Sequence, residues 1–353
     1  MRKIKVAIAG VGNCASALVQ GLQYYSKKGP DEGLTYWDLG GYTPKDVEFV
    51  AAFDVNSRKV GKDLSQAILQ PPNNTVKIVD VPKLGVQVKK GPVLDGIGKY
   101  LKDVVSVSPQ PAQDVAQELK DSGAEILVNY LPVGSTEASR NYAEAALAAG
   151  VAFVNAIPVF IASDPTWAAR FEKAGLPVAG DDVMSQIGST VIHKTLVKMA
   201  IDRGVKVDET YQLNIGGDTD FLNMLEETRL KDKRESKTSA VRAMSPYEVP
   251  TRIGPSDYVP FLENDKVCYI WLKGRYFGGS VVKVDLKLHV IDAYDSGGVM
   301  VDAIRGARVA LDRKVGGQLV SVSAFCFKHP PVQMPYLAAK AAFEEFTSGE
   351  RER

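Results

Sequence analysis

The sequence has few of the residues that mark several common protein classes. Only three cysteines and three histidines occur among its 353 residues. The cysteines are far apart and odd in number, so they indicate no disulfide framework. None of these residues has the spacing of a structural zinc site. No apolar run approaches the roughly 20 residues that a membrane-spanning helix needs.

The chain also lacks an excess of charge of either sign. Lys and Arg total 43 and Asp and Glu total 42, which gives a formal net charge of +1. Proteins that bind nucleic acids or membrane surfaces by general electrostatic attraction usually carry a clear basic excess. We therefore expect no nucleic-acid or membrane partner. The first residues run into a strand-like segment rather than a secretory leader, so we expect a cytoplasmic protein.

The first half of the chain alternates buried strands with amphipathic helices. The run IKVAIA at residues 4–9 is apolar except for one lysine, as in a strand buried on both faces of a parallel sheet. The same reasoning predicts further strands at 47–53, 125–128, 151–154 and 176–179, and helices at 15–24 and 135–149. This alternation predicts a doubly wound α/β sheet.

After about Gly204 the pattern changes. Three segments, 205–215, 267–273 and 281–290, alternate apolar and polar residues, as in a half-exposed antiparallel sheet. A charged, helix-like segment lies between them at 225–242, and helices are expected again at 300–312 and 335–346. We therefore predict a first unit over 1–204 and 297–353, and an inserted α+β unit over 205–296. Segments 26–45 and 70–92 are expected to be loops.

The first motif with chemical meaning is the turn Gly10-Val11-Gly12-Asn13-Cys14-Ala15 after the first strand. Gly10 permits a tight turn, Gly12 lets the backbone approach a pyrophosphate, and Ala15 is small where helix meets strand. The N–H groups of the following helix would face the phosphates, with Asn13 and Cys14 beside them. The turn predicts a Rossmann-type dinucleotide site, and the alternative is a small-residue turn without a ligand.

Asp54 ends the second predicted strand. A carboxylate there can accept hydrogen bonds from the adenosine ribose and would repel a 2′-phosphate, so NAD is favoured over NADP. The spacing from the glycine turn exceeds the usual value of about 20 residues because segment 26–45 is inserted. An Asp that only caps a turn is the alternative.

Other polar groups follow later strands at the edge where ligands collect. Leu131 and Pro132 follow the strand at 125–128, and Asp182 and Ser185 follow the strand at 176–179. The adjacent pair Asp181–Asp182 could orient a cofactor, hold a cation or cap the next helix, and the sequence leaves these roles open.

The second half contains a polar cluster followed by paired lysines. Asn214, Gly217, Asp220 and Asn223 surround a Gly-Gly turn, which indicates a hydroxyl-rich ligand. Lys233 and Lys237 are four residues apart, so on a helix they share one face and could clamp a phosphate. A solvated charged face is the alternative.

Three more charged residues, Lys266, Asp292 and Lys328, lie in largely apolar surroundings. Lys328 follows the aromatic segment AFCF, where desolvation lowers the pKa of an ammonium group toward values useful in acid–base chemistry. By position alone each lysine could equally be a surface residue.

Together these segments resemble myo-inositol-1-phosphate synthase, especially its short bacterial and archaeal form. The matching stretches keep their order along most of the chain: 11–16, 50–55, 96–100, 130–135, 153–158, 180–182, 214–217, 220–223, 236–238 and 328–331. The resemblance implies that D-glucose 6-phosphate becomes 1L-myo-inositol 1-phosphate. Oxidation at C5 by NAD, enolisation, aldol closure onto C1 and reduction by the same NADH give a net isomerisation.

The resemblance also implies roles for individual residues. The family's essential residues match Lys233, Lys237, Lys266, Asp292 and Lys328. We expect Lys328 to handle the O5 proton, the other three lysines to bind phosphate and oxyanions, and Asp292 to orient a neighbouring lysine. The resemblance further implies a homotetramer built through the inserted catalytic unit, and it leaves open whether a divalent or monovalent cation takes part.

Two positions depart from the family pattern. Met184 stands where many relatives have a lysine, and Asp218 stands where they commonly have an asparagine. Met184 keeps open a catalytically silent NAD or sugar-phosphate binder. An NAD-dependent dehydrogenase of a sugar phosphate or hydroxy acid, which would use the same N-terminal unit and release NADH, is the other interpretation.

Overall fold

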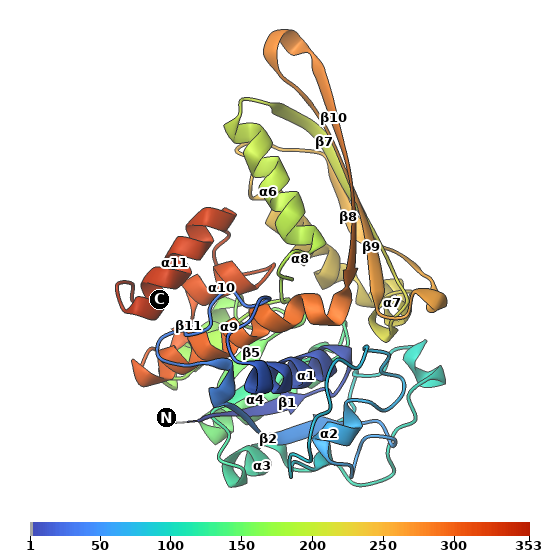
Figure 1. The fold of residues 1–353 in the computed structure, drawn as a ribbon, viewed down its shortest axis with the longest axis vertical. Coiled ribbons are helices and arrows are strands. Elements are labelled where there is room, and N and C mark those ends of the chain that lie inside the picture. The colour runs from blue at the N-terminus through green and yellow to red at the C-terminus, as the bar shows by residue number, and fades with distance from the viewer. Residues whose placement is uncertain (1–2) are drawn as a thin grey trace.

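The computed structural model describes residues 3–353. It has two parts, one built on a seven-stranded sheet and one on a four-stranded sheet that stands above it (Figure 1). Residue 3 and residue 353 both lie in the first part. Within residues 3–353, no helix is both long and apolar enough to cross a lipid bilayer.

The seven-stranded sheet is entirely parallel. Its order is β11-β6-β5-β4-β1-β2-β3, so the chain reverses its direction of travel across the sheet between β1 and β4. The strands are β1 (Ile4–Ala9), β2 (Val47–Asp54), β3 (Val88–Lys90), β4 (Ile126–Asn129), β5 (Ala152–Asn155), β6 (Pro177–Ala179) and β11 (Gly317–Gln318). Ligands of such sheets bind at the carboxyl ends of the strands, where the order reverses. The predicted doubly wound, Rossmann-type sheet is confirmed.

Helices cover both faces of this sheet. One face packs against α1 (Asn13–Lys28), α9 (Asp292–Asp312), α10 (Val320–Cys326) and α11 (Tyr336–Ser348). The other packs against α3 (Val115–Asp121), α4 (Thr136–Ala149) and α5 (Pro165–Lys173), while the short α2 (Leu64–Ala67) lies beside β3. In β1, Ile4 and Val6 enter the first cluster and Ala7 and Ala9 the second, which explains its nearly continuous apolar sequence.

The second sheet has the order β10-β9-β7-β8. Its strands are β7 (Lys206–Gly216), β8 (Thr251–Tyr258), β9 (Asp265–Arg275) and β10 (Val281–Ile291). The pairs of β9 with β7 and β10 are antiparallel, as expected, but β7 and β8 are parallel. The sequence did not predict β8 because Gly254 and Pro255 interrupt it, and both residues are unfavourable inside a strand.

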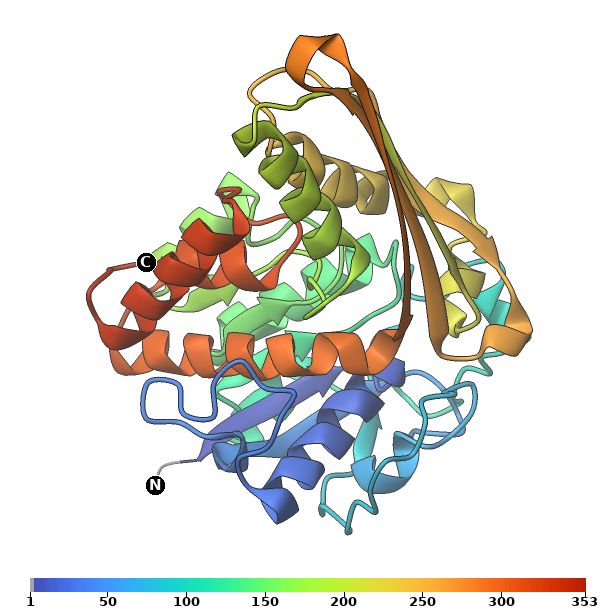
Figure 2. The same ribbon diagram turned by 45° about the horizontal axis from the view of Figure 1, so that its top comes forward.

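Helices α6 (Ser189–Asp202) and α8 (Lys231–Arg242) cover one face of the second sheet, and the short α7 (Thr219–Asn223) lies at one end of it (Figure 2). Residues 3–353 also contain five 3₁₀ turns, at Pro44–Asp46, Leu101–Asp103, Glu227–Arg229, Pro260–Leu262 and Phe277–Gly279. Although α6 falls within range 1–204, it packs with the second sheet.

Helix α9 connects the two parts. It begins at Asp292, directly after β10, and then packs along α1. Its Arg305 has a fully buried side chain that forms an ion pair of 2.6 Å with Asp302. The same guanidinium donates to the backbone carbonyls of Tyr36, Trp37 and Tyr42, and so ties loop 29–43 to the core.

We expect replacement of Arg305 by Leu to destabilise the protein by about 3 kcal/mol, since it leaves the buried Asp302 without its counter-ion. Urea unfolding of the two proteins measures the change. Arg203→Leu, at an exposed position, serves as the control and should change the unfolding free energy by less than about 0.5 kcal/mol. Equal midpoints for all three proteins would show that this anchor contributes nothing.

Candidate active site

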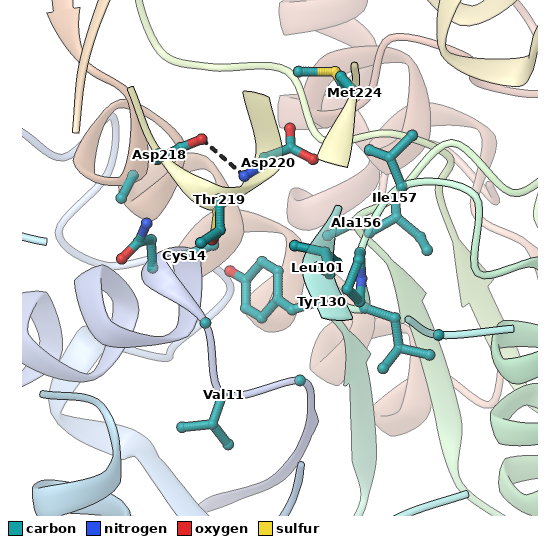
Figure 3. A pocket seen from close by; sticks show the side chains of 18 of the residues that line it. Val11, Cys14, Leu101, Tyr130, Ala156, Ile157, Asp218, Thr219, Asp220 and Met224 are labelled. Atoms are coloured by element: carbon teal, nitrogen blue, oxygen red, sulfur yellow. Dashed lines mark hydrogen bonds between the residues drawn. The ribbon is translucent and has the colours of Figure 1, made fainter. Parts of the chain in front are cut away.

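One cavity lies at the carboxyl ends of β1, β2 and β4, and residues of β9 and α7 also line it. Figure 3 shows part of its wall. Both parts of the molecule contribute to its wall. Fifteen of the nineteen residues that the sequence nominated line it: Gly10, Gly12, Asn13, Cys14, Asp54, Leu131, Pro132, Asp182, Ser185, Asp220, Lys233, Lys237, Lys266, Asp292 and Lys328. Residues separated by more than 300 positions in the chain therefore meet around one space.

Four nominated residues lie outside the cavity wall. Ala15 is buried behind the glycine turn. Asn214 is buried in β7 and donates to the carbonyl of Gly254 at 2.9 Å. A side chain at Gly217 would collide with the backbone of Val259. Asn223 donates to the carbonyl of Val133 at 2.9 Å, so it joins α7 to the loop after β4.

The glycine turn brings two backbone segments into contact at one end of the cavity. Gly10 has a φ of +92°, and a Cβ there would lie 2.6 Å from the carbonyl oxygen of Tyr130. Gly12 is the N-terminal cap of α1 and provides no side-chain cap. The first turn of α1 therefore presents its N–H groups and its positive dipole end toward the cavity, which suits a phosphate.

Asp54 is held rigidly beside this turn. Its Oδ2 accepts the N–H of Val11 at 2.9 Å, and its Oδ1 accepts the N–H groups of Val55 and Asn56. Each carboxylate oxygen can accept two hydrogen bonds, so Asp54 keeps capacity for a ligand hydroxyl. The ammonium group of Lys59 lies 3.8 Å from Oδ2, and burial lowers the pKa of this lysine.

A segment of irregular structure, residues 69–80, crosses the start of α1 and will be called the strap. The side-chain oxygen of Asn13 accepts the N–H groups of Asn74 and Thr75 at 2.9 and 3.2 Å. Farther along, the side chain of Gln20 accepts the N–H of Ile78 at 2.9 Å. Tyr294 at the start of α9 donates to the carbonyl of Val76, and Asn264, directly before β9, donates to the side chain of Asn74 at 3.4 Å. The strap therefore contacts both parts of the molecule.

At the other end of the cavity, Asp182 binds several donors. It accepts hydrogen bonds from Ser236 at 2.5 Å and Lys328 at 3.0 Å, and the ammonium group of Lys233 lies 3.6 Å away. Burial alone would raise the pKa of Asp182, but the charges of Lys233 and Lys328 hold it well below the usual value. Asp182 is therefore a permanent anion that orients two cations.

The other lysines differ in their partners. Lys266 pairs with Asp292 at 2.6 Å, and this carboxylate raises the pKa of Lys266 despite burial. The ammonium group of Lys237 has no hydrogen bond or ion pair within the described residues, and the side chain is buried. Burial and the charges of Lys233, Lys266 and Lys328 lower its pKa well below the usual value. Lys237 is thus the group in this cluster best suited to be a neutral amine.

Asp218 and Asp220 border the same cavity from the start of α7 (Figure 3). Asp218 caps this helix by accepting the N–H groups of Asp220 and Phe221 at 2.9 and 3.0 Å. Burial, together with the nearby carboxylates of Asp292 and Asp220, raises the pKa of Asp218 to about 7. The site therefore contains one carboxyl group that titrates near neutral pH.

The two carboxylates of the pair Asp181–Asp182 have different roles. Asp181 is fully buried and accepts hydrogen bonds from Asn155 and from the backbone of residues 161–163. It therefore fixes the loop between β5 and α5. Asp182 faces the cavity. The side chain of Met184 is buried and does not belong to the cavity wall.

Several residues of the site were not found by sequence reasoning. Lys59 looked like an ordinary loop lysine, and no local pattern reveals that it is buried beside Asp54. Tyr130 and Ser236 occurred in the matched stretches, but nothing in their spacing gave them a role. No group of three or more His, Cys, Asp or Glu side chains in residues 3–353 is arranged to hold a metal ion.

Comparison with known proteins shows the relationships of the chain. A profile of the family described as myo-inositol-1-phosphate synthase matches residues 188–293. An inositol-3-phosphate synthase of Mycolicibacterium smegmatis is 50% identical, and the match covers 98% of each chain. One from Corynebacterium glutamicum is 48% identical over 97% of this chain and 98% of the relative.

A solved structure has the same fold. It is that of a myo-inositol-1-phosphate synthase-related protein from Thermotoga maritima, with a TM-score of 0.83 and 26% sequence identity. The match covers 98% of this chain and 99% of the other.

The titration of Asp218 has a consequence for stability. The ordinary pKa of an aspartate side chain is 3.8, and that of Asp218 is about 7 in the folded protein. Its stabilising contribution is therefore complete below pH 3.8 and is lost as the pH rises through 7. We expect Asp218→Asn, which stays neutral, to remove this loss, so that the variant is the more stable protein above neutral pH.

Thermal unfolding from pH 5 to pH 9 (about two units either side of the pKa) measures this difference for both proteins. Parallel profiles would contradict the assignment of the neutral titration to Asp218. Asp257→Asn, at an exposed position remote from the cavity wall, is the matched control and should leave the profile unchanged.

Proposed function

This chain belongs to the myo-inositol-1-phosphate synthase family and is an isomerase-class enzyme, and we propose that it converts D-glucose 6-phosphate to 1L-myo-inositol 1-phosphate with NAD as a recycled cofactor. The observation that carries the proposal is the shared cavity. A dinucleotide-type glycine turn lines the same space as four lysines, of which three are buried and the fourth, Lys328, has a side chain that is 12% exposed. A hydride acceptor and a phosphorylated sugar could therefore bind side by side there, in the cytoplasm where we propose that the enzyme acts.

The residues at the glycine turn fit NAD. The start of α1 would face the diphosphate, and Asp54, which retains acceptor capacity, would bind the adenosine ribose and disfavour a 2′-phosphate. Bound NAD would supply a hydride acceptor for C5 and return the hydride after ring closure. The remaining chemistry requires this chain to bind anions and to move protons.

Cations in the cavity would bind the phosphate and the oxyanions that form during enolisation and ring closure. Lys233 and Lys266 are suited to this task because carboxylates raise the pKa of each, so both remain charged. Donors that are already oriented in a site shielded from water stabilise such oxyanions by several kcal/mol. Asp292 would keep Lys266 in place.

Two lysines with lowered pKa values are available for proton transfer. Lys328 is oriented by Asp182, and we propose that it handles the O5 proton during the transfers of hydride from and to C5. Lys237 lacks a partner, and its neutral amine could accept a proton from C6. Ser236 helps to hold Asp182, and through it Lys328, in position.

We also propose that the protein is a homotetramer formed through the uncovered face of the second sheet. Tyr211 and Trp271 stack there with ring centroids 5.3 Å apart, and Leu213 and Tyr269 are exposed beside them. Contiguous exposed aromatic residues commonly mark interfaces. Light scattering on the purified chain measures the mass of the assembly and would contradict the proposal if it gave a monomer.

The deciding experiment is NMR analysis of the product after incubation with glucose 6-phosphate and NAD. We expect an inositol phosphate and no accumulation of NADH. Stoichiometric NADH with an oxidised sugar would instead identify a dehydrogenase. Binding of both ligands without turnover would identify a silent binder, and either result would overturn the synthase assignment.

Variants of Lys237 test whether this residue acts as a base or as a fixed cation. We expect both Lys237→Met and Lys237→Arg to lower kcat by about 100-fold or more, because arginine keeps the charge but cannot accept a proton at this pH. Lys266→Arg, which preserves a cation, should lower kcat by a smaller factor. The dissociation constant for NAD, measured by calorimetry, should stay unchanged in the Lys237 variants.

The dependence of kcat on pH gives an independent test of the role of Lys237. Because the pKa of Lys237 is lowered, its neutral form should persist well below the pH at which a free lysine protonates, and kcat should fall only on the acid side. Near-normal activity of Lys237→Arg would show that Lys237 acts as a cation.

A further inference from the structure

The hydroxyl group of Tyr130 is a buried polar atom without a hydrogen-bond partner. Seven buried side-chain oxygens in residues 3–353 share this property, but only the one of Tyr130 belongs to a residue that lines the active-site cavity. An unpaired buried hydroxyl costs free energy, and phenylalanine would fill the same space without that cost. A ligand that pairs with the hydroxyl would account for a tyrosine here.

The backbone and the ring of Tyr130 are both fixed. Its N–H donates to the carbonyl of Ala9 at 2.8 Å, and its own carbonyl lies against Gly10, where a Cβ would be 2.6 Å away. The ring packs against the two apolar clusters that contain α1. The hydroxyl therefore has a defined direction before any ligand binds, which lowers the entropic cost of forming a hydrogen bond.

The hydroxyl lies on the side of the cavity where α1 begins, and both Tyr130 and Cys14 line the cavity. Figure 3 shows the hydroxyl of Tyr130 pointing toward Cys14 in the first turn of α1. Tyr130 follows β4, whereas Asp54 ends β2, and these strands flank β1 on opposite sides. The hydroxyl is thus separated from the ribose-binding carboxylate by the helix start that would face the diphosphate. In sheets of this order the second nucleotide of a dinucleotide binds on the β4 side.

We propose that the Tyr130 hydroxyl donates a hydrogen bond to the nicotinamide half of the bound dinucleotide and so helps to distinguish the whole cofactor from its adenosine half. The inference rests on the proposed use of NAD. Burial raises the pKa of Tyr130 well above its usual value, so the group remains protonated and acts as a donor rather than a base. Tyr130 would bind the cofactor without transferring a proton.

The test compares wild type with Tyr130→Phe in the full chain, by calorimetric titration with NAD and with ADP in the absence of substrate. We expect the dissociation constant for NAD to rise about fivefold to tenfold, the effect of losing one neutral hydrogen bond. The constant for ADP should not change, because ADP lacks the nicotinamide half. The melting temperature of the free protein should stay equal or rise, since an unpaired hydroxyl is removed.

Tyr25→Phe is the matched control. It removes a hydroxyl that donates to the carbonyl of Glu32 at 2.9 Å, on the exposed side of α1 and remote from the cavity wall. It should leave both dissociation constants unchanged.

Three results for Tyr130→Phe would overturn the inference. They are an unchanged dissociation constant for NAD, an equal rise of the dissociation constants for NAD and ADP, or a lower melting temperature of the free variant. Wild type that binds no NAD at all would instead refute the proposed function. The failure of the two proposals can therefore be distinguished.

Discussion

The site depends on the balance of charge around Asp182. Four ammonium groups in one buried cavity would repel each other, and burial alone already disfavours their charged forms. Three carboxylates stabilise part of this charge at fixed places. Asp182 pairs with Lys328 and Lys233, Asp220 also pairs with Lys233, and Asp292 pairs with Lys266. Lys237 is left without such a partner, so its pKa falls. The unequal distribution of three carboxylates among four lysines therefore gives chemically similar side chains different protonation states.

Much of the first sheet could be predicted because its strands are short apolar runs with clear ends. The run at 4–9 coincides with β1, and the predicted strands at 47–53 and 151–154 differ from β2 and β5 by a single residue at one end or both. β3, with its two lysines, and the two-residue β11 gave no such signal. In the second half, the charged sequence of α8 predicted a helix, but not that two of its lysines would be buried. The charged groups that surround these two lysines include Lys266 of β9, Asp292 at the start of α9 and Lys328 after α10. Local sequence contains no information on such distant contacts.

The same limit applies to the candidate site. Glycine turns and carboxylates after strands have local signatures, and Gly10, Gly12 and Asp54 could be nominated from them. Spacing and surroundings made the lysines candidates, but only the family resemblance favoured an active-site role, because in isolation each is compatible with a solvated surface residue. Asn214 and Asn223 illustrate the converse: they occur in the matched stretches, yet their side chains connect backbone segments outside the cavity wall. A shared motif can maintain the framework of a site as well as its ligand contacts.

If NAD is the recycled cofactor, as proposed above, the strap would slow its exchange with solvent. Residues 69–80 cross the start of α1 and are tied to it through Asn13 and Gln20, and to α9 through Tyr294. A dehydrogenase must exchange its spent nucleotide after every catalytic cycle, and a covered binding site would limit its rate. An enzyme that regenerates the oxidised form within each cycle has no such requirement. Slow exchange then brings an advantage, because the reduced nucleotide stays beside the ketone until the hydride has returned, and a half-finished product is not released.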